Sequence, residues 1–100
     1  KSASPSSNSF QIAETQTFQR QLKKRRELNS LYPKINNYVY PILRDNPFFG
    51  PNIKRLKGEF SDVYRYRIGD YRLFYTVDEG RVTVFVLNLD HRKNAYRRRT

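Results

Sequence analysis

The sequence contains no cysteine, and this absence removes several kinds of site at once. A chain without cysteine has no disulfide, no thiolate metal ligand and no cysteine nucleophile. It also lacks any apolar run near the roughly 18 residues that span a bilayer, and it shows no signal-peptide pattern. We therefore expect a cytoplasmic protein with no membrane partner. We also expect no metal and no small-molecule cofactor.

Acidic residues are scarce relative to basic ones. The 20 Lys and Arg residues exceed the 9 Asp and Glu residues and give a net charge of +11 on 100 residues. Such an excess indicates an anionic partner. Because the arginines are interleaved with aromatic residues on expected strands, the pattern favours nucleic acid over a membrane surface, where basic residues typically gather on an amphipathic helix.

The length is sufficient for one small domain and one modest core. The segment 1–9 (KSASPSSNS) is rich in serine, and we expect it to be a flexible tail or a cloning remnant. The remaining residues, 10–100, are expected to form a single domain. Fifteen per cent of the chain is aromatic, which argues against disorder because Tyr and Phe bring large apolar areas.

The first half of the domain predicts one strand and two helices. Phe10–Ala13 alternates like a strand, and Thr15 or Thr17 is suited to cap a helix that runs to about Leu28 with Phe18 and Leu22 on its inner face. A second helix is expected to begin near Pro33, to be kinked or shortened at Pro41, and to end at Asp45-Asn46-Pro47. The following segment, Phe48–Gly58, is expected to be a loop or a short extension. The apolar stripe of the second helix is predicted to comprise Leu31, Ile35, Tyr38, Val39 and Ile42.

The second half predicts a β-hairpin followed by a central strand. Val63–Ile68 and Tyr71–Val77 are joined by Gly69-Asp70, a two-residue loop that fixes the register. The last strand, Arg81–Leu89, is apolar on both faces, which is typical of a central strand. The elements predict an α+β fold in the order β-α-α-β-β-β, with a sheet of about four strands, two N-terminal helices on one face and a basic concave surface on the other.

The hairpin register places Arg67 opposite Arg72, with Arg65 on the same face. Like charges directly opposite one another destabilise a sheet. We therefore expect an anion to bind between these arginines.

Two stretches, YRYRIGDYRLFY and VFVLNLDHRKNAY, resemble the RelE/ParE superfamily of bacterial toxins from type II toxin–antitoxin systems. The segments TFQRQLKK and NPFFGPNIKRLKG are similar to that family too. The resemblance implies a RelE-like toxin that cleaves mRNA in the ribosomal A site without a metal, inhibits translation and pairs with a cognate acidic antitoxin. Two alternatives stay open: a ParE-like inhibitor of DNA gyrase without nuclease activity, and a non-catalytic nucleic-acid-binding module.

The resemblance also implies roles for individual residues. Arg72 matches the family's hairpin arginine that contacts the scissile phosphate, Arg92 matches the arginine after the last strand, and Tyr96 matches the tyrosine that follows. Arg65 and Arg67 stand where some members carry lysines. An arginine does not lose its proton near neutral pH, so these two residues can act only electrostatically.

Metal-free RNA cleavage by the 2′-OH needs a base, cations around the phosphorane and an acid at the leaving oxygen. Tyr96, His91 and Glu59 are the candidate bases, although His91 and Tyr96 each have a purely structural alternative. The predicted catalytic residues are Arg72, Arg92, Tyr96, His91 and Arg67. The predicted RNA contacts are Arg65, Lys54, Lys57, Phe74, Lys93 and Arg97.

Overall fold

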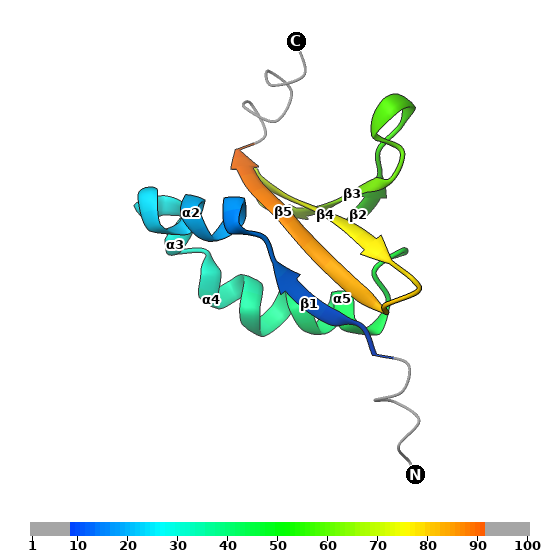
Figure 1. Cartoon of the computed structure of the whole chain (residues 1–100). Coiled ribbons are helices and arrows are strands. Elements are labelled where there is room, and N and C mark those ends of the chain that lie inside the picture. Colours follow the sequence, from blue (N-terminus) through cyan, green and yellow to red (C-terminus); the bar gives the residue numbers. More distant parts are fainter. Residues whose placement is uncertain (1–8, 92–100) are drawn as a thin grey trace.

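A mixed β-sheet is covered by helices on one face (Figure 1). The computed structural model describes residues 9–91. In chain order, the elements are β1 (Gln11–Glu14), α2 (Gln16–Lys24), α3 (Arg26–Asn29), α4 (Tyr32–Lys34), the π-helical turn η1 (Ile35–Val39), α5 (Tyr40–Asp45), β2 (Ile53–Arg55), the 3₁₀ turn η2 (Gly58–Phe60), β3 (Val63–Ile68), β4 (Tyr71–Asp78) and β5 (Thr83–His91). This is the α+β architecture that the sequence predicted.

The sheet has five strands in the order β1-β5-β4-β3-β2, where about four were expected. β1 pairs in parallel with β5, and all other neighbouring strands are antiparallel. β5 lies between two strands, as its two apolar faces predicted. The additional strand is β2, a three-residue edge strand inside the segment that was expected to be a loop or a short extension.

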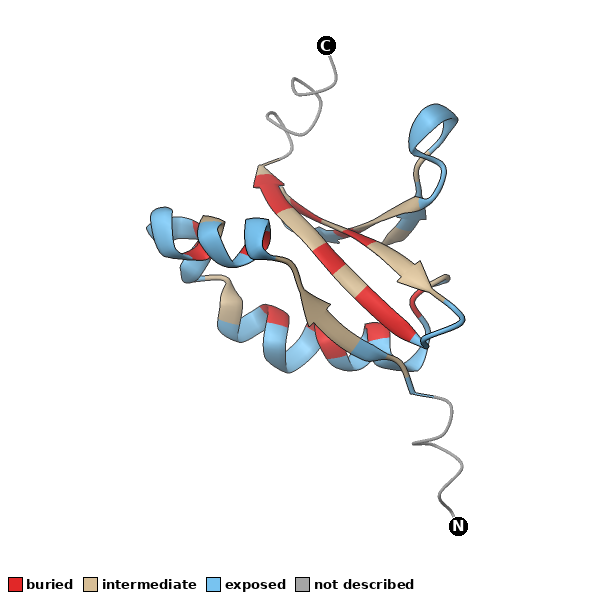
Figure 2. Cartoon of the chain, in the orientation of Figure 1, coloured by how far each residue is buried: buried red, intermediate tan, exposed pale blue. Residues whose placement is uncertain are grey.

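The hydrophobic core lies between the helices and one face of the sheet (Figure 2). The strand residues of this core alternate along β3, β4 and the first half of β5, so they share one face. This is the face that the helices cover, and we call it the helix face. The core comprises Phe18, Leu22, Leu28, Ile35, Val39, Tyr40, Leu43, Tyr66, Ile68, Leu73, Tyr75, Val84, Val86 and Leu89.

The β3–β4 hairpin has the register that its two-residue loop predicted. Ile68 pairs with Tyr71, and Arg67 pairs with Arg72. Gly69 has a φ of +58°, which the first loop position of a type II′ turn requires and which glycine adopts without strain. The arginines of both strands therefore share the face opposite the core.

The first helical segment begins at the predicted cap. Thr15 Oγ1 accepts a hydrogen bond from the backbone N–H of Phe18 at 3.3 Å, and both Phe18 and Leu22 are buried as expected. Arg25 interrupts the helix with an extended backbone, at φ −121° and ψ 112°. The helix resumes as α3 over Arg26–Asn29, so the predicted end near Leu28 is confirmed although the break was not foreseen.

The second helical segment continues through Pro41, where the sequence predicted a kink or a shorter helix. It begins at Tyr32 with Pro33 in its first turn, as expected. In η1 the N–H of Tyr40 donates to the carbonyl of Ile35, one residue further back than in an α-helix. Pro41 then occupies the first turn of α5, where its missing N–H costs little. The π turn allows the helix to run on past the proline.

The π turn also changes which side chains face the core. Tyr38 and Ile42 were expected to point inward, and this prediction was wrong because their relative exposures are 67% and 43%. Ile35 and Val39 are buried as expected, and Leu43, four residues after Val39, is buried where Ile42 was expected. A π turn contains more residues than an α turn, so the inward face advances along the sequence after it.

Candidate functional site

The sheet face turned away from the helices carries the arginines of β3 and β4, and we call it the arginine face. Side chains alternate between the two faces of a strand, so the core residues of β3 and β4 place Arg65, Arg67 and Arg72 on the opposite face. Lys54 shares this face because it pairs with Arg65 across β2 and β3. The structure therefore brings these four predicted site residues together, and Phe74, which lies opposite Arg65, is a fifth.

The first row of this face runs across three strands as Arg67, Arg72 and Asp90. Directly opposed residues in an antiparallel pair have Cβ atoms about 4.5–5.5 Å apart, so each member of the row neighbours the next. Arg67 is exposed, whereas Arg72 and Asp90 have relative exposures of 8% and 3%. The row places two guanidinium groups beside one buried carboxylate.

The second row lies next to the first and runs across four strands as Lys54, Arg65, Phe74 and Asn88. Lys54 is exposed, and the other three residues are half-buried. Phe74 lies between a guanidinium and an amide, so its ring offers an apolar surface beside two polar neighbours. An unstacked nucleobase is recognised by this combination of ring stacking and flanking hydrogen bonds.

Arg72 is the most confined cation of the arginine face. Its Nη1 donates to the carbonyl of Tyr71 at 3.5 Å, which is a long hydrogen bond. Its Nε is buried and has no hydrogen-bond partner among the described residues. A buried donor without an acceptor costs about 1–3 kcal/mol, so this N–H gains most from an incoming oxygen atom.

A β-bulge decides which residues of β5 reach the arginine face. Pairing shifts by one residue after Phe74, which leaves Leu87 of β5 without a direct partner. A shift of one residue exchanges the two faces of a strand. Beyond the bulge, Asp90 rather than Leu89 therefore lies opposite Arg72.

Asp90 is a site residue that the sequence reasoning missed, as is its neighbour Asn88. Its carboxylate accepts a hydrogen bond from Nδ2 of Asn88 at 2.7 Å. If side chains alternated along β5 from the β4–β5 turn without a bulge, Asp90 would lie on the helix face. The strand pattern therefore gave no sign that it belongs to the arginine face. The signal that was available is chemical, because an acidic residue near the end of an apolar strand is unusual unless it is paired.

His91 lies on the other face of β5 from Asp90. It pairs in register with Tyr71, and their rings meet edge to face with centroids 5.2 Å apart. Tyr71 belongs to the helix face, where it packs against the core. The structure thus does not bring His91 together with Arg67 and Arg72, because the bulge turns its side chain away from them.

The remaining predicted residues fall outside the two rows. Glu59 and Lys57 are exposed in and beside η2, in the connection that projects beyond the sheet (Figure 1). Four further predictions, Arg92, Lys93, Tyr96 and Arg97, lie outside the described residues.

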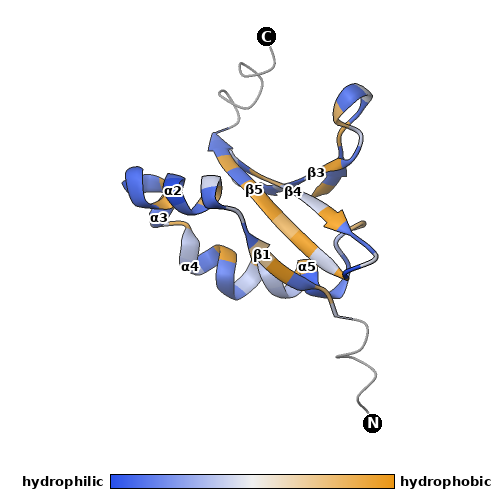
Figure 3. Ribbon diagram, in the orientation of Figure 1, coloured by the Kyte–Doolittle hydropathy of each residue, from blue (hydrophilic) through white to orange (hydrophobic). Residues whose placement is uncertain are grey.

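The basic outer side of α2 is hydrophilic (Figure 3).

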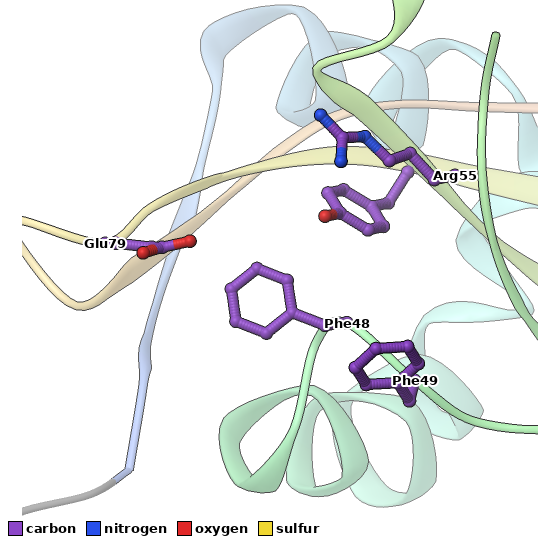
Figure 4. A pocket seen from close by; sticks show the side chains of 5 residues that line it. Phe48, Phe49, Arg55 and Glu79 are labelled. Carbon is purple, nitrogen blue, oxygen red and sulfur yellow. The ribbon is translucent and has the colours of Figure 1, made fainter.

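A separate aromatic pocket of about 310 Å³ opens near the other end of the sheet (Figure 4). It is lined by Phe48, Phe49 and Tyr64, with Arg55 and Glu79 at its rim. The guanidinium of Arg55 lies 5.8 Å from the ring centroid of Tyr64. None of the residues of the two rows lines this pocket.

Between residues 9 and 91, no three His, Asp or Glu residues gather as ligands of a metal ion would. Over the same range, no helix is both long enough and apolar enough to cross a membrane.

Both the sequence and the fold of this chain are similar to those of known toxins. The family model described as "ParE toxin of type II toxin-antitoxin system, parDE" matches residues 11–96. Toxin RelG of Mycobacterium tuberculosis is 35% identical over 78 residues, which cover 74% of this chain and 87% of that toxin. The chain therefore belongs to the RelE/ParE superfamily of toxins from type II toxin–antitoxin systems.

Solved structures support the same assignment. The toxin–antitoxin complex RelBE2 from Mycobacterium tuberculosis contains a chain that is similar with a TM-score of 0.66 and 29% identity, covering 84% of this chain and 92% of that one. The archaeal RelE–RelB complex from Pyrococcus horikoshii contains a chain that shares the fold with a TM-score of 0.63 and 23% identity, covering 84% of this chain and 96% of that one.

Proposed function

We propose that this toxin is a metal-independent, ribosome-dependent mRNA endonuclease that inhibits translation in the cytoplasm. The observation that carries the proposal is the first row of the arginine face. There Arg67 and Arg72 lie side by side, and Arg72 has a buried donor without an acceptor among residues 9–91. Guanidinium groups donate in a fixed fork that suits phosphate oxygens. The second row adds Lys54 and Arg65 for neighbouring phosphates.

The reaction would begin with attack of a 2′-OH on the adjacent phosphorus atom. The bond from phosphorus to the 5′ oxygen breaks, which leaves a 2′,3′-cyclic phosphate and a 5′-hydroxyl. Arg72 and Arg67 would stabilise the charge that develops on the phosphorane. Arginine keeps its proton, so proton transfer falls to other groups, with Tyr96 and His91 as the candidates. Arg92 would complete the cation set.

A translating extract tests this proposal directly. The wild-type toxin should produce new 5′ ends on a reporter mRNA only while that message is being translated. Arg72→Gln should reduce cleavage by about 10²–10³-fold, by analogy with the loss of one oxyanion donor. Arg81→Gln is the matched control, since Arg81 is an exposed turn residue whose side chain has a relative exposure of 78%. Equal cleavage by the two variants would remove Arg72 from the mechanism.

Two conservative changes separate the candidate bases. Tyr96→Phe removes one hydroxyl and keeps the ring, so a large loss of rate assigns proton transfer or substrate binding to the phenol. His91→Gln should have little effect, because His91 packs on Tyr71 away from Arg72. A dead His91→Gln variant beside an active Tyr96→Phe variant reverses the assignment.

Inhibition of DNA gyrase is the second candidate function. It is favoured by the matching family model, whose description names ParE toxins. A ParE-like toxin needs a protein contact and no phosphorane stabilisation. Purified toxin that blocks gyrase supercoiling, with no cuts in translated mRNA and no effect of Arg72→Gln, would establish this second candidate instead.

We propose a cognate acidic antitoxin as the physiological partner. The net charge of +11 calls for an anionic surface on the partner. Two of the similar structures are complexes of a toxin with its antitoxin. Binding would cover the arginine face, which would block access of RNA to Arg72, or it would displace the chain beyond β5.

A further inference from the structure

The burial of Arg72 requires a compensating negative charge. A guanidinium removed from water is costly unless it is paired, and Arg67 on the neighbouring strand adds a second positive charge. On the other side, the register places Asp90 directly opposite Arg72. The row therefore balances one of its two cations with an internal carboxylate.

The surroundings of Asp90 keep its carboxylate in place. Asn88 lies two residues earlier on the same face of β5, and its Nδ2 donates to Asp90 Oδ2 at 2.7 Å. The charge of Asp90 also reaches Arg25 at the break between α2 and α3. The pKa of Arg25 is raised, first by its hydrogen bond to Glu27 and more weakly by nearby charges that include Asp90.

We propose that the Asp90 carboxylate is the resident counter-ion of Arg72 in the free toxin, and that an incoming phosphate oxyanion competes with it for the same guanidinium. Asp90 supplies charge, while Arg72 Nε has no hydrogen-bond partner in the part of the chain that the structure describes. The donor thus stays available to a ligand oxygen although the guanidinium is already compensated. Only the identity of that ligand, an RNA phosphate, rests on the proposed function.

The arrangement makes Asp90 a positioning residue with two opposite effects. It stabilises the fold, because without it two cations face each other across β3 and β4 with no anion in their row. It also weakens anion binding, because its carboxylate lies on the strand next to Arg72 and repels a phosphate bound there. This repulsion is significant at the effective dielectric constant of about 20 that applies near a protein surface. A residue with a purely structural role shows only the first effect.

Inorganic phosphate provides the test, since it needs neither ribosome nor cleavage. We expect Asp90→Asn to bind phosphate about tenfold more tightly than wild type in a calorimetric titration, and to gain more thermal stability from added phosphate. Glu79→Gln is the matched control, because it makes the same charge change at an exposed turn. In Asp90→Asn combined with Arg72→Gln, the gain in affinity should disappear.

The same variants decide the outcome when folding itself is affected. Asp90→Asn should be less stable than wild type in phosphate-free buffer, and either added phosphate or Arg67→Gln should restore its stability. The proposal is overturned if Asp90→Asn and Glu79→Gln bind phosphate equally. It is also overturned if neither phosphate nor Arg67→Gln restores a destabilised Asp90→Asn. A toxin that binds phosphate as expected but cuts no mRNA contradicts the proposed function alone.

Discussion

Gln21 and Leu89 exchange two hydrogen bonds although they are 68 positions apart in the chain. Nε2 of Gln21 donates to the carbonyl of Leu89 at 3.1 Å, and the N–H of Leu89 donates to Oε1 at 2.8 Å. β1 pairs with β5 only as far as Val86, so beyond Val86 no described strand lies beside this edge of β5. The side-chain amide replaces that strand and ties α2 to the part of β5 that carries Asp90.

Replacing Gln21 with Leu should destabilise the fold by about 1–3 kcal/mol, because the backbone groups of Leu89 lose their partners in a partly buried setting. Urea denaturation measures the difference in unfolding free energy. Gln19→Leu, an exposed change on the same helix, should be nearly neutral. Equal stabilities of the two variants would show that the amide pair contributes nothing.

Stability should fall at alkaline pH because of two tyrosines around Glu14. The hydroxyls of Tyr32 and Tyr40 both donate to Glu14 Oε2 at 2.7 Å. Burial, and then the bond to Glu14, raises the pKa of Tyr32 to about 12 and that of Tyr40 further. In the unfolded chain the two tyrosine hydroxyls lose their protons near pH 10. Their contribution to the free energy of unfolding is therefore complete below about pH 10 and is lost as the pH rises toward 12.

Urea denaturation between pH 9 and pH 11.5 checks this dependence. Tyr40→Phe should flatten the decline, since it removes one of the protons that only the folded chain retains. Tyr38→Phe, at a tyrosine with a relative exposure of 67%, should leave the decline unchanged. An identical pH profile for wild type and Tyr40→Phe contradicts the prediction.

Val82 holds a positive φ of 49° in the turn between β4 and β5, a region that β-branched residues rarely adopt. Asparagine tolerates this backbone, so Val82→Asn should stabilise the protein by about 1 kcal/mol. Val82→Ala removes the same apolar contacts and keeps the strain, so it should not stabilise. A melting temperature of Val82→Asn at or below that of Val82→Ala would disprove the strain.

The affinity for single-stranded RNA should fall linearly with salt on logarithmic axes, because bound phosphates release counterions. Arg65→Gln should reduce the magnitude of this slope by about 0.7 and weaken binding across sequences without preference. Arg81→Gln, in the distant turn, should leave the slope unchanged. Binding that does not depend on salt from 50 to 300 mM would indicate a protein target such as gyrase.

The arginine face could be predicted from sequence because a two-residue loop transmits its register along a hairpin. The two-residue alternation of a strand and the register of one turn were enough to place three arginines on one face, namely Arg65, Arg67 and Arg72. The partner of Arg72 on β5 could not be predicted in the same way. The bulge at Leu87 moves every later residue to the other face, and no residue type marks it.

The second helix shows the same limitation for helical periods. Its start at Tyr32-Pro33 and its end before Asn46-Pro47 follow from proline chemistry, and both were predicted. Its inward face was mispredicted at Tyr38 and Ile42 because a π turn lengthens one repeat. The edge strand β2 was not predicted for another reason, because three residues are too few to show the alternation of a strand.

The position of β5 sets an order of events during synthesis. This strand lies between β1 and β4, so β1 joins the sheet only through the strand that follows all the others in the sequence. A nascent chain that lacks β5 has neither the edge that receives β1 nor the carboxylate opposite Arg72. Contacts of such long sequence separation form late in folding. The row of Arg67, Arg72 and Asp90 is therefore complete only after β5, the last strand of the described sheet, has been synthesised.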